Sequence, residues 1–192
     1  MKILIDGVDF QAHHNGLTEL IKAVAEHCAS TQKVVKSLTV DGKHVVTDIN
    51  SLQNNTFKDI QTLEFFTVSY ENLCYNTLEE MADYLEKLEQ GYDSIVSLVD
   101  SNKVDDAMSV LNAATAGIEW MNTAFSKIIN ILKIELTDEE NDFIKTYLDH
   151  LNDLVAALEK TDYVDLKDII TYDLKNDIIE WRKLLQKYNK RG

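Results

Sequence analysis

From Cys74 onward, apolar residues recur at alternating steps of three and four, and no other feature of the sequence constrains the fold so strongly. Four such stripes follow one another, over residues 74–99, 104–132, 144–158 and 166–185, and the last needs one register adjustment. This spacing places the apolar residues on one face of an α-helix, and a seven-residue repeat keeps that face against a neighbouring helix. We therefore predict four long helices that bury these stripes against one another, because such helices are not stable alone in water.

The breaks between the stripes are short and carry signals for the start of a helix. Ser101 and Asn102 separate the first two stripes, and Thr161 and Asp162 open the last. Residues 137–140 read Thr-Asp-Glu-Glu, a capping box in which the threonine hydroxyl and the second glutamate each satisfy a free backbone N–H group. Short connections make consecutive helices antiparallel, so the sequence predicts an up-down-up-down four-helix bundle over residues 70–192.

The part before the helices has a different pattern, in which short β-branched runs alternate with turn signals. Asp-Gly pairs at residues 6–7 and 41–42 predict tight hairpins, since both residue types tolerate a positive φ. Apolar residues over 17–28 recur at helical spacing and predict a helix of about four turns. Residues 49–58 are irregular and polar. The expected strands are residues 2–5, 8–11, 34–40, 43–47 and 60–68.

The resulting order is strand, strand, helix, strand, strand, irregular segment, strand. In this topology the first part resembles the β-grasp fold of ubiquitin-like domains. The predicted fold class is therefore α+β, with a small β-grasp-like domain over residues 1–69 followed by an antiparallel four-helix bundle over residues 70–192. The final Lys190, Arg191 and Gly192 lack the conjugating diglycine tail of the ubiquitin-like family, so we do not expect the protein to act as a modifier.

The chain is strongly acidic, with 19 Lys and Arg residues against 33 Asp and Glu residues and a formal net charge of −14. Proteins bind phosphate backbones through Lys and Arg, so a nucleic-acid partner is not expected. The acids concentrate in the helical part, where residues 134–180 hold 14 acids against 4 bases. This surface is either a solvated face of the bundle or an attractive surface for a basic or amphipathic protein partner.

The sequence favours a cytoplasmic protein with no membrane insertion. No apolar run approaches the roughly 18 to 20 residues of a membrane-spanning helix. Asp6 and Gly7 come too early for a secretory signal. The only cysteines, Cys28 and Cys74, stand at apolar positions of expected helices, which predicts buried structural thiols in a reducing compartment.

No catalytic or metal-binding motif stands out. His13 and His14 fall in an expected polar loop, where adjacent side chains rarely converge on one ion. A di-iron bundle site requires a Glu-x-x-His motif on each of two helices, whereas the helical part has one histidine, His150, and no such motif. Residues 100–106 begin like a calcium loop but lack its oxygen ligand and glycine. We therefore predict no catalytic residue, no metal and no cofactor.

One segment is a candidate for partner binding, because residues 113–117 are all small and Trp120 follows in the same helix. Small side chains allow a neighbouring helix to approach closely. This neighbour is either another helix of the same bundle or a helix of another protein that binds in a shallow groove. The predicted contact residues for a partner are Met108, Ala113, Ala114, Thr115, Gly117, Trp120 and Met121. Thr115 and Asn122 are polar residues on the expected apolar stripe, where they either fix the register of the helices or lie beneath such a groove.

Several features of residues 84–181 occur together. Tyr84 lies in the first helix, a short charged break covers residues 102–107, and small and apolar residues repeat in the second helix. Tyr147 and Trp181 add aromatic residues in the later helices. In these features the segment resembles flagellar export chaperones of the flagellin-binding type. The resemblance implies an acidic cytoplasmic bundle whose grooves hold the helical terminus of a secreted subunit.

We expect a non-enzymatic protein-binding module, such as an adaptor, an assembly factor or an export-chaperone-like protein. Its partner is a helical or basic protein segment, for example an amphipathic helix, and the exposed edge of the sheet is a further candidate contact. The alternative is a small-molecule or metal-dependent enzyme with a site at the domain junction that uses His13, His14 or His150. Self-association into a homodimer also fits the pattern, because bundle seams can pair between chains.

Overall fold

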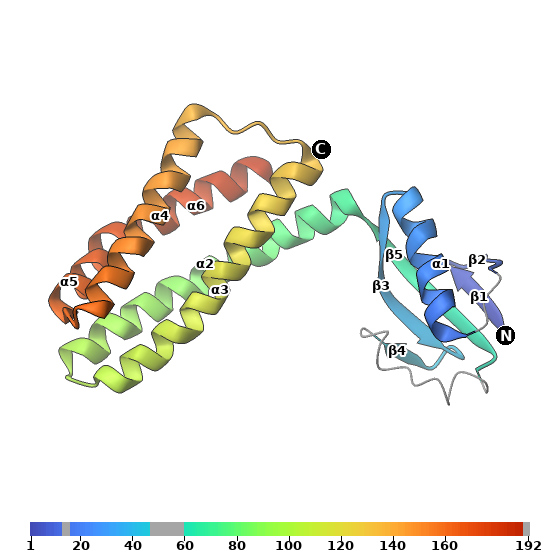
Figure 1. The fold of residues 1–192 in the computed structure, drawn as a ribbon, viewed down its shortest axis with the longest axis horizontal. Helices are drawn as coiled ribbons and strands as arrows, with labels where there is room; N and C mark the ends of the chain where they lie inside the picture. Colours follow the sequence, from blue (N-terminus) through green and yellow to red (C-terminus); the bar gives the residue numbers. More distant parts are fainter. Residues whose placement is uncertain (13–15, 47–59, 190–192) are drawn as a thin grey trace. The chain divides into compact units, whose positions relative to one another are not determined.

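The computed structural model of the protein describes residues 1–12, 16–46 and 60–189, and its fold is α+β, as predicted. The chain divides into two compact units, Met1–Leu73 and Cys74–Gly192. The first unit is built around a small mixed sheet, and the second consists mostly of helices (Figure 1). Each unit has its own hydrophobic core.

The first unit contains a five-stranded sheet and helix α1. Its elements are β1 (Lys2–Ile5), β2 (Val8–Asp9), α1 (Leu17–Ser30), β3 (Lys33–Val40), β4 (His44–Val46) and β5 (Thr62–Ser69). The strands are arranged in the order β2-β1-β5-β3-β4. β1 and β5 are parallel, and the other neighbouring pairs are antiparallel. A parallel pair needs a long crossover connection, which here includes α1, β3 and β4.

Both predicted Asp-Gly hairpins are confirmed. Asp6 and Gly7 have φ values of 49° and 81°, and Asp41 and Gly42 have φ values of 50° and 69°. Two successive residues in the left-handed region give the turn whose twist matches the flanking strands. The Asp41 carboxylate also accepts a hydrogen bond of 2.7 Å from the N–H of Thr62, which joins the second turn to the start of β5.

Helix α1 covers one face of the sheet (Figure 1). The register of the parallel pair sets Ile3 beside Leu63 and Ile5 beside Phe65, so these side chains share that face. The predicted last strand begins at Thr62 rather than at residue 60, and the predicted irregular segment 49–58 lies outside the described residues. The buried core of this unit comprises Leu20, Val24 and Cys28 of α1, with Ile3, Ile5, Leu38, Ile60, Leu63 and Phe65.

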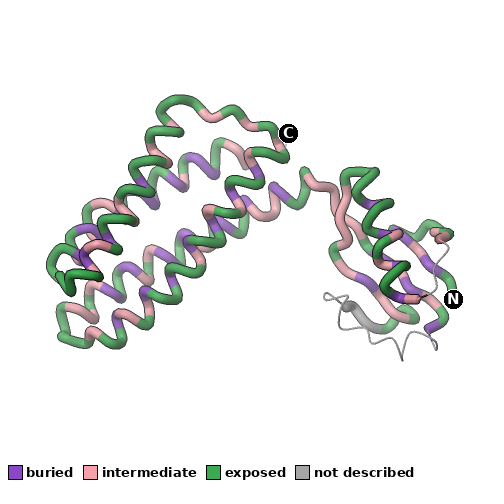
Figure 2. Tube along the Cα trace, viewed as in Figure 1, coloured by how far each residue is buried: buried purple, intermediate pink, exposed green. Residues whose placement is uncertain are grey.

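The helical part follows directly from β5, and its breaks fall where the sequence predicts them. Residues 163–188, at its end, form one continuous helical rod made of three segments. The elements are α2 (Tyr70–Asp100), α3 (Val104–Leu132), α4 (Asp138–Glu159), α5 (Tyr163–Asp168), the π-helical segment η3 (Ile169–Leu174) and α6 (Lys175–Tyr188). Buried positions recur along each of them at helical spacing (Figure 2).

The π-helical segment explains the register adjustment in the fourth stripe. Leu166, Ile170, Leu174 and Ile178 follow one another at three successive steps of four. Such a run drifts off one face of a regular α-helix, whereas a π turn takes up one extra residue. All four side chains are therefore buried in the same core.

The burial of α3 differs from the predicted stripe. The expected core positions Met108, Thr115 and Asn122 are half-buried or exposed, whereas Ala114 and Met121 are buried. Two adjacent faces of a helix can each be described by steps of three and four, and alanine is easily overlooked as a core residue. The choice between these faces is made by the packing of α3 against the other helices.

Three ion pairs join α2 to the rod formed by α5, η3 and α6. From one pair to the next, the residue number in α2 rises while the residue number in the rod falls, so the two are antiparallel. Each pair is partly exposed and contributes at most about 1 kcal/mol, but together the pairs fix direction and register. They are Glu89 with Arg182 at 2.6 Å, Asp93 with Lys175, and Asp100 with Lys167.

Candidate functional site

The small-residue segment of α3 packs tightly against Tyr84 of α2. The Tyr84 hydroxyl donates a hydrogen bond of 2.9 Å to the carbonyl oxygen of Ala114. A Cβ atom at Gly117 would lie 2.1 Å from the Tyr84 hydroxyl oxygen, so only glycine leaves room for this ring. Burial raises the pKa of Tyr84, and the phenol is therefore a neutral donor at pH 7. The small residues thus serve first to let α2 approach α3.

Trp120 lies next to this contact and is exposed. Its ring meets the Tyr84 ring edge-on, with 6.0 Å between centroids and an angle of 81°. The Trp120 side chain is 39% exposed, and Ala113 and Ala116 are exposed on the same side of α3. We call Ala113, Ala116 and Trp120 the Trp120 face. It presents one large aromatic ring next to two small side chains.

The seven predicted contact residues do not share one surface. Ala114 and Met121 face the core of the helical unit, and Gly117 contacts Tyr84. Met108 and Thr115 lie on the side of α3 away from the Trp120 face, given the turn of about 100° per residue. The predicted residues that the structure leaves accessible together are Ala113 and Trp120. In the sequence, Gly117 is an isolated glycine inside an apolar helical pattern, and this is the signal that indicates its close contact with α2.

A buried ion pair joins α4 to α6, and sequence reasoning missed it. His150 Nδ1 lies 2.8 Å from an Asp177 carboxylate oxygen, and Asp177 is only 6% exposed. Burial alone would lower the pKa of His150, but the hydrogen bond and charge of Asp177, with Asp173 and Asp153 nearby, raise it. Burial also raises the pKa of Asp177, which His150 only partly offsets. His150 therefore keeps its proton to a higher pH than an isolated histidine does.

The sequence did contain a signal for Asp177. This carboxylate stands three residues after Leu174 and four before Trp181, at a spacing that places it on the apolar stripe. An acid at such a position requires a partner, because an unpaired buried charge costs several kcal/mol. The identity of the partner depends on how α4 packs against α6 and could not be read from spacing.

Aromatic residues fill the core beside this ion pair. The Trp181 ring meets Tyr147 and Phe125 edge-on at 5.5 and 5.0 Å between centroids. The hydroxyls of Tyr92 and Tyr147 and the indole N–H of Trp181 are buried without a hydrogen-bond partner among the described residues. Burial raises the pKa of both tyrosines, with the Asp177 charge adding to the effect. Both phenols are therefore neutral at pH 7.

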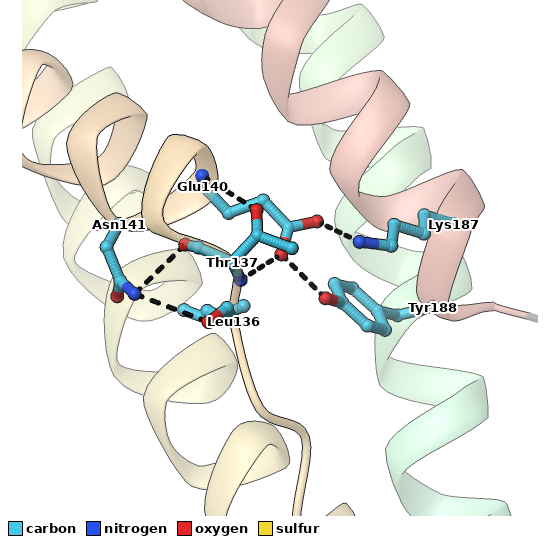
Figure 3. A network of polar contacts seen from close by, with 6 residues as sticks. All are labelled: Leu136, Thr137, Glu140, Asn141, Lys187 and Tyr188. Carbon is cyan, nitrogen blue, oxygen red and sulfur yellow. Dashed lines mark hydrogen bonds and ion pairs between the residues drawn. The ribbon is translucent and has the colours of Figure 1, made fainter.

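The start of α4 is fixed to the end of α6 by a polar network (Figure 3). The predicted capping box is confirmed: the Thr137 hydroxyl accepts from the Glu140 N–H, and the Glu140 carboxylate accepts from the Thr137 N–H. The same carboxylate accepts from Lys187 at 2.6 Å and from the Tyr188 hydroxyl at 2.8 Å. Burial would raise the pKa of Glu140, but these hydrogen bonds outweigh it and lower the pKa. Glu140 is thus a structural anion.

The first unit contains a cavity of about 310 Å³ beside the turn between β1 and β2. Phe10, His27, Cys28 and Lys33 contribute to its wall. Burial raises the pKa of the Cys28 thiol, and the nearby Asp6 carboxylate adds to this, so the thiol is neutral at pH 7. The prediction of buried cysteines is confirmed, since both are buried and neither forms a disulfide.

The Asp6 carboxylate in the wall of this cavity is occupied by structural hydrogen bonds. It accepts from the N–H and hydroxyl of Thr67 at 2.8 and 2.5 Å and from Lys33 at 3.0 Å. Burial would raise the pKa of Asp6, but these contacts lower it. Asp6 therefore joins the first hairpin to β5.

The remaining site predictions concern metals and membranes. Within residues 1–12, 16–46 and 60–189, no group of three or more His, Cys, Asp or Glu side chains is arranged to hold a metal ion. His13 and His14 lie outside the described residues. Over the same part of the chain, no helix combines the length and apolarity that crossing a bilayer requires.

These observations define a two-unit α+β protein whose helical unit presents a tryptophan on a face of small residues. Residues 76–184, more than half of the chain, match the family described as Domain of unknown function (DUF8042), and the chain belongs to that family. Residues 1–69, which end with the last residue of β5, match the model described as TP0873 N-terminal domain. No curated protein and no solved structure matches the chain.

Proposed function

We propose that the protein is a non-enzymatic protein-binding module, an adaptor, assembly factor or export-chaperone-like protein, and that the Trp120 face of α3 binds a helical segment of its partner. The observation that carries this proposal is a tryptophan with 39% of its surface exposed beside the small side chains of Ala113 and Ala116. Tryptophan is the residue type most enriched among the contacts that dominate protein–protein affinity.

The setting of Trp120 supports a binding role. Tyr84 supports the Trp120 ring edge-on, and the Tyr84 hydroxyl is itself held by the carbonyl oxygen of Ala114. An aromatic side chain that is ordered before binding loses little conformational freedom when a partner arrives. Ala113 and Ala116, about two turns and one turn before Trp120, add little bulk, so a partner helix can bring its backbone close to α3 there and pack its side chains against the indole.

The proposal includes a finer description of the fold. For the first unit we propose a β-grasp arrangement, supported by the parallel central pair β1 and β5 and by α1 on one face. For the second unit we propose a four-helix up-down bundle. Antiparallel contacts support it between α2 and α3, α2 and α6, and α4 and α6. The acidic composition and the two buried cysteines, neither of which forms a disulfide, support a cytoplasmic location.

The test compares three forms of the full chain as bait: wild type, Trp120→Ala and Val164→Ala. Val164 is a matched control because it is 73% exposed and lies on α5. Partners are captured from the native cell, identified by mass spectrometry, and then titrated against each bait by calorimetry. We expect the W120A form to bind a captured partner at least about tenfold more weakly and the V164A form to bind it like wild type.

The proposal fails if each captured partner binds W120A as tightly as wild type. Circular dichroism and thermal unfolding check that loss of binding is not caused by misfolding of the variants. We expect W120A to fold, because Trp120 is exposed and its truncation leaves the core intact. Sedimentation of the wild type covers the case in which the captured protein is a second copy of this chain.

A further inference from the structure

Helix α4 carries a second apolar surface, separate from the Trp120 face. Leu148 is 45% exposed and Val155 is 53% exposed. They are seven residues apart and so lie on the same side of the helix. The half-buried Ile144, Leu151 and Leu158 continue the same line. We call these five residues the α4 stripe.

The two exposed residues of the α4 stripe, Leu148 and Val155, face away from α6, whereas Ile144, Leu151 and Leu158 pack against the core of the helical unit. His150, which contacts Asp177 of α6, lies about 160° around the helix from Leu148 and about 140° from Val155, at 100° per residue. The side of α4 that packs against α6 is thus nearly opposite the two exposed residues. Their exposure shows that the other helices cover the stripe only in part.

The charge around the stripe is predominantly negative. Glu140, the one acid of α4 that is paired with a base, contacts Lys187. Lys145 is the one base within Asp138–Glu159. In the described part of the chain, no basic side chain forms an ion pair with the other exposed acids of α4. These acids are Asp138, Glu139, Asp142, Asp149, Asp153 and Glu159.

We propose that the α4 stripe is a docking surface for a basic amphipathic helix of a partner protein. Apolar residues at steps of four and three match the seam by which one helix packs along another. Lysines and arginines on the flanks of the incoming helix would meet the acids of α4, which favours this partner and speeds its capture. A second copy of this chain would instead bring the same acids together, and an anionic membrane surface would repel them.

This inference goes beyond the proposed function, because it assigns a different helix and adds the charge of the partner. The two surfaces are tested separately. The Trp120 face lies on α3 and its matched variant is W120A, whereas the α4 stripe is removed by the double variant Leu148→Gln with Val155→Gln. Both changes are made at exposed positions, so the helical unit remains folded.

The test uses two synthetic peptides of about five helical turns. Both have leucine at the same heptad positions, and the remaining positions are lysine in one peptide and glutamate in the other. Each is titrated by calorimetry into wild type, L148Q/V155Q, W120A and Ile179→Gln, where Ile179 is a control of similar exposure on α6. We expect the lysine peptide to bind wild type, W120A and I179Q with similar Kd and L148Q/V155Q at least about tenfold more weakly.

Two further readouts follow from the charges. The Kd of the lysine peptide rises between about 50 and about 300 mM salt, because salt screens the exposed acids. The double charge reversal Asp142→Lys with Asp149→Lys weakens binding by at least about tenfold. This second variant also keeps the proposal testable if L148Q/V155Q fails to fold, as judged by circular dichroism.

Three results would each overturn the inference. The first is equal affinity of the lysine peptide for wild type and L148Q/V155Q. The second is equal binding of the glutamate peptide. The third is a wild-type dimer in sedimentation equilibrium that L148Q/V155Q converts to monomer, because the occupant would then be a second copy of the chain. If the first result comes together with weaker binding to W120A, the peptide binds the Trp120 face, and the proposed function stands.

Discussion

Gly117 offers the sharpest test of how α2 and α3 pack. Replacing it with alanine adds a Cβ atom at 2.1 Å from the Tyr84 hydroxyl oxygen and 2.2 Å from the adjacent ring carbon. No pair of such atoms tolerates this distance, so the Tyr84 ring must move. Gly91 in α2 provides the control, because a Cβ atom there would lie 3.9 Å from Val110, an ordinary contact.

The expected free-energy change combines a gain and a larger loss. Alanine is favoured over glycine inside a helix by about 1 kcal/mol. Moving Tyr84 sacrifices its hydrogen bond to Ala114, about 0.5–1.5 kcal/mol, and strains the surrounding packing by about 1–3 kcal/mol. Gly117→Ala should therefore destabilise the helical unit by about 1–3 kcal/mol. Gly91→Ala should stabilise it by about 0.5–1 kcal/mol.

A double-mutant cycle with Tyr84→Ala isolates the contact. Without the ring, the new methyl group at position 117 has no clash to relieve, so only the helix preference remains. Gly117→Ala should then stabilise the Tyr84→Ala protein by about 0.5–1 kcal/mol. The sign of the Gly117 effect therefore reverses, and the coupling energy between the two sites is about 2–4 kcal/mol.

The measurement is urea unfolding followed by tryptophan fluorescence. The two tryptophans of the chain, Trp120 and Trp181, both lie in the helical unit, so the signal reports that unit. The urea concentration at the unfolding midpoint is compared between variants, and it reports a change in stability when the m-value is unchanged. If Gly117→Ala raises the stability of the otherwise wild-type protein as Gly91→Ala does, the packing described here for Tyr84 is wrong.

Two further predictions concern the polar contacts of α4. Replacing Glu140 with alanine removes its half of the capping box of α4 and its bonds to Lys187 and Tyr188. This change should cost about 1–3 kcal/mol, whereas the neighbouring Glu139→Ala should cost almost nothing. Because the pKa of Glu140 is lowered in the folded protein, its contribution to the free energy of unfolding is present above the ordinary pKa of 4.5. That contribution disappears as the pH falls through the folded value. Equal unfolding midpoints of E140A and wild type at pH 7 would contradict the stabilising role of Glu140. The pKa of His150 is raised by Asp177, so its contribution is complete below the ordinary pKa of 6.5 and is lost as the pH rises through the folded value. Unfolding measured from pH 6 to pH 8 should therefore show stability falling by at most about 1.4 kcal/mol per pH unit, and a His150→Asn variant that keeps the same slope would refute the assignment.

Local features of the sequence were predictable because their causes are local. The Asp-Gly pairs at residues 6–7 and 41–42 form hairpins since both residue types accept a positive φ. The capping box at Thr137 depends only on residues three apart in the chain. The extra step in the fourth stripe required a register change, and the structure makes it with a π-helical segment.

The candidate site was predictable only in part. The small residues of α3 and Trp120 stood out in the sequence, but which of them reach the surface depends on where α2 lies. Tyr84 is 30 residues from Ala114 in the chain, and its contact with Gly117 removes that glycine from any partner surface. Leu148 and Val155 belong to an ordinary apolar pattern, and only their exposure in the folded helical unit distinguishes them from core residues.

The sequence by itself determined the α+β class, the turns, the capping box of α4 and the length of the helices, because each follows from steric and hydrogen-bonding preferences of near neighbours. Tertiary structure alone decided that Asp177 meets His150, that α3 turns Ala114 and Met121 inward, and that α4 leaves Leu148 and Val155 in water. The physical reason is that an apolar helical pattern states how much surface must be buried. It does not state which neighbouring helix buries it, and that choice follows from side-chain shapes and charges brought together across the fold.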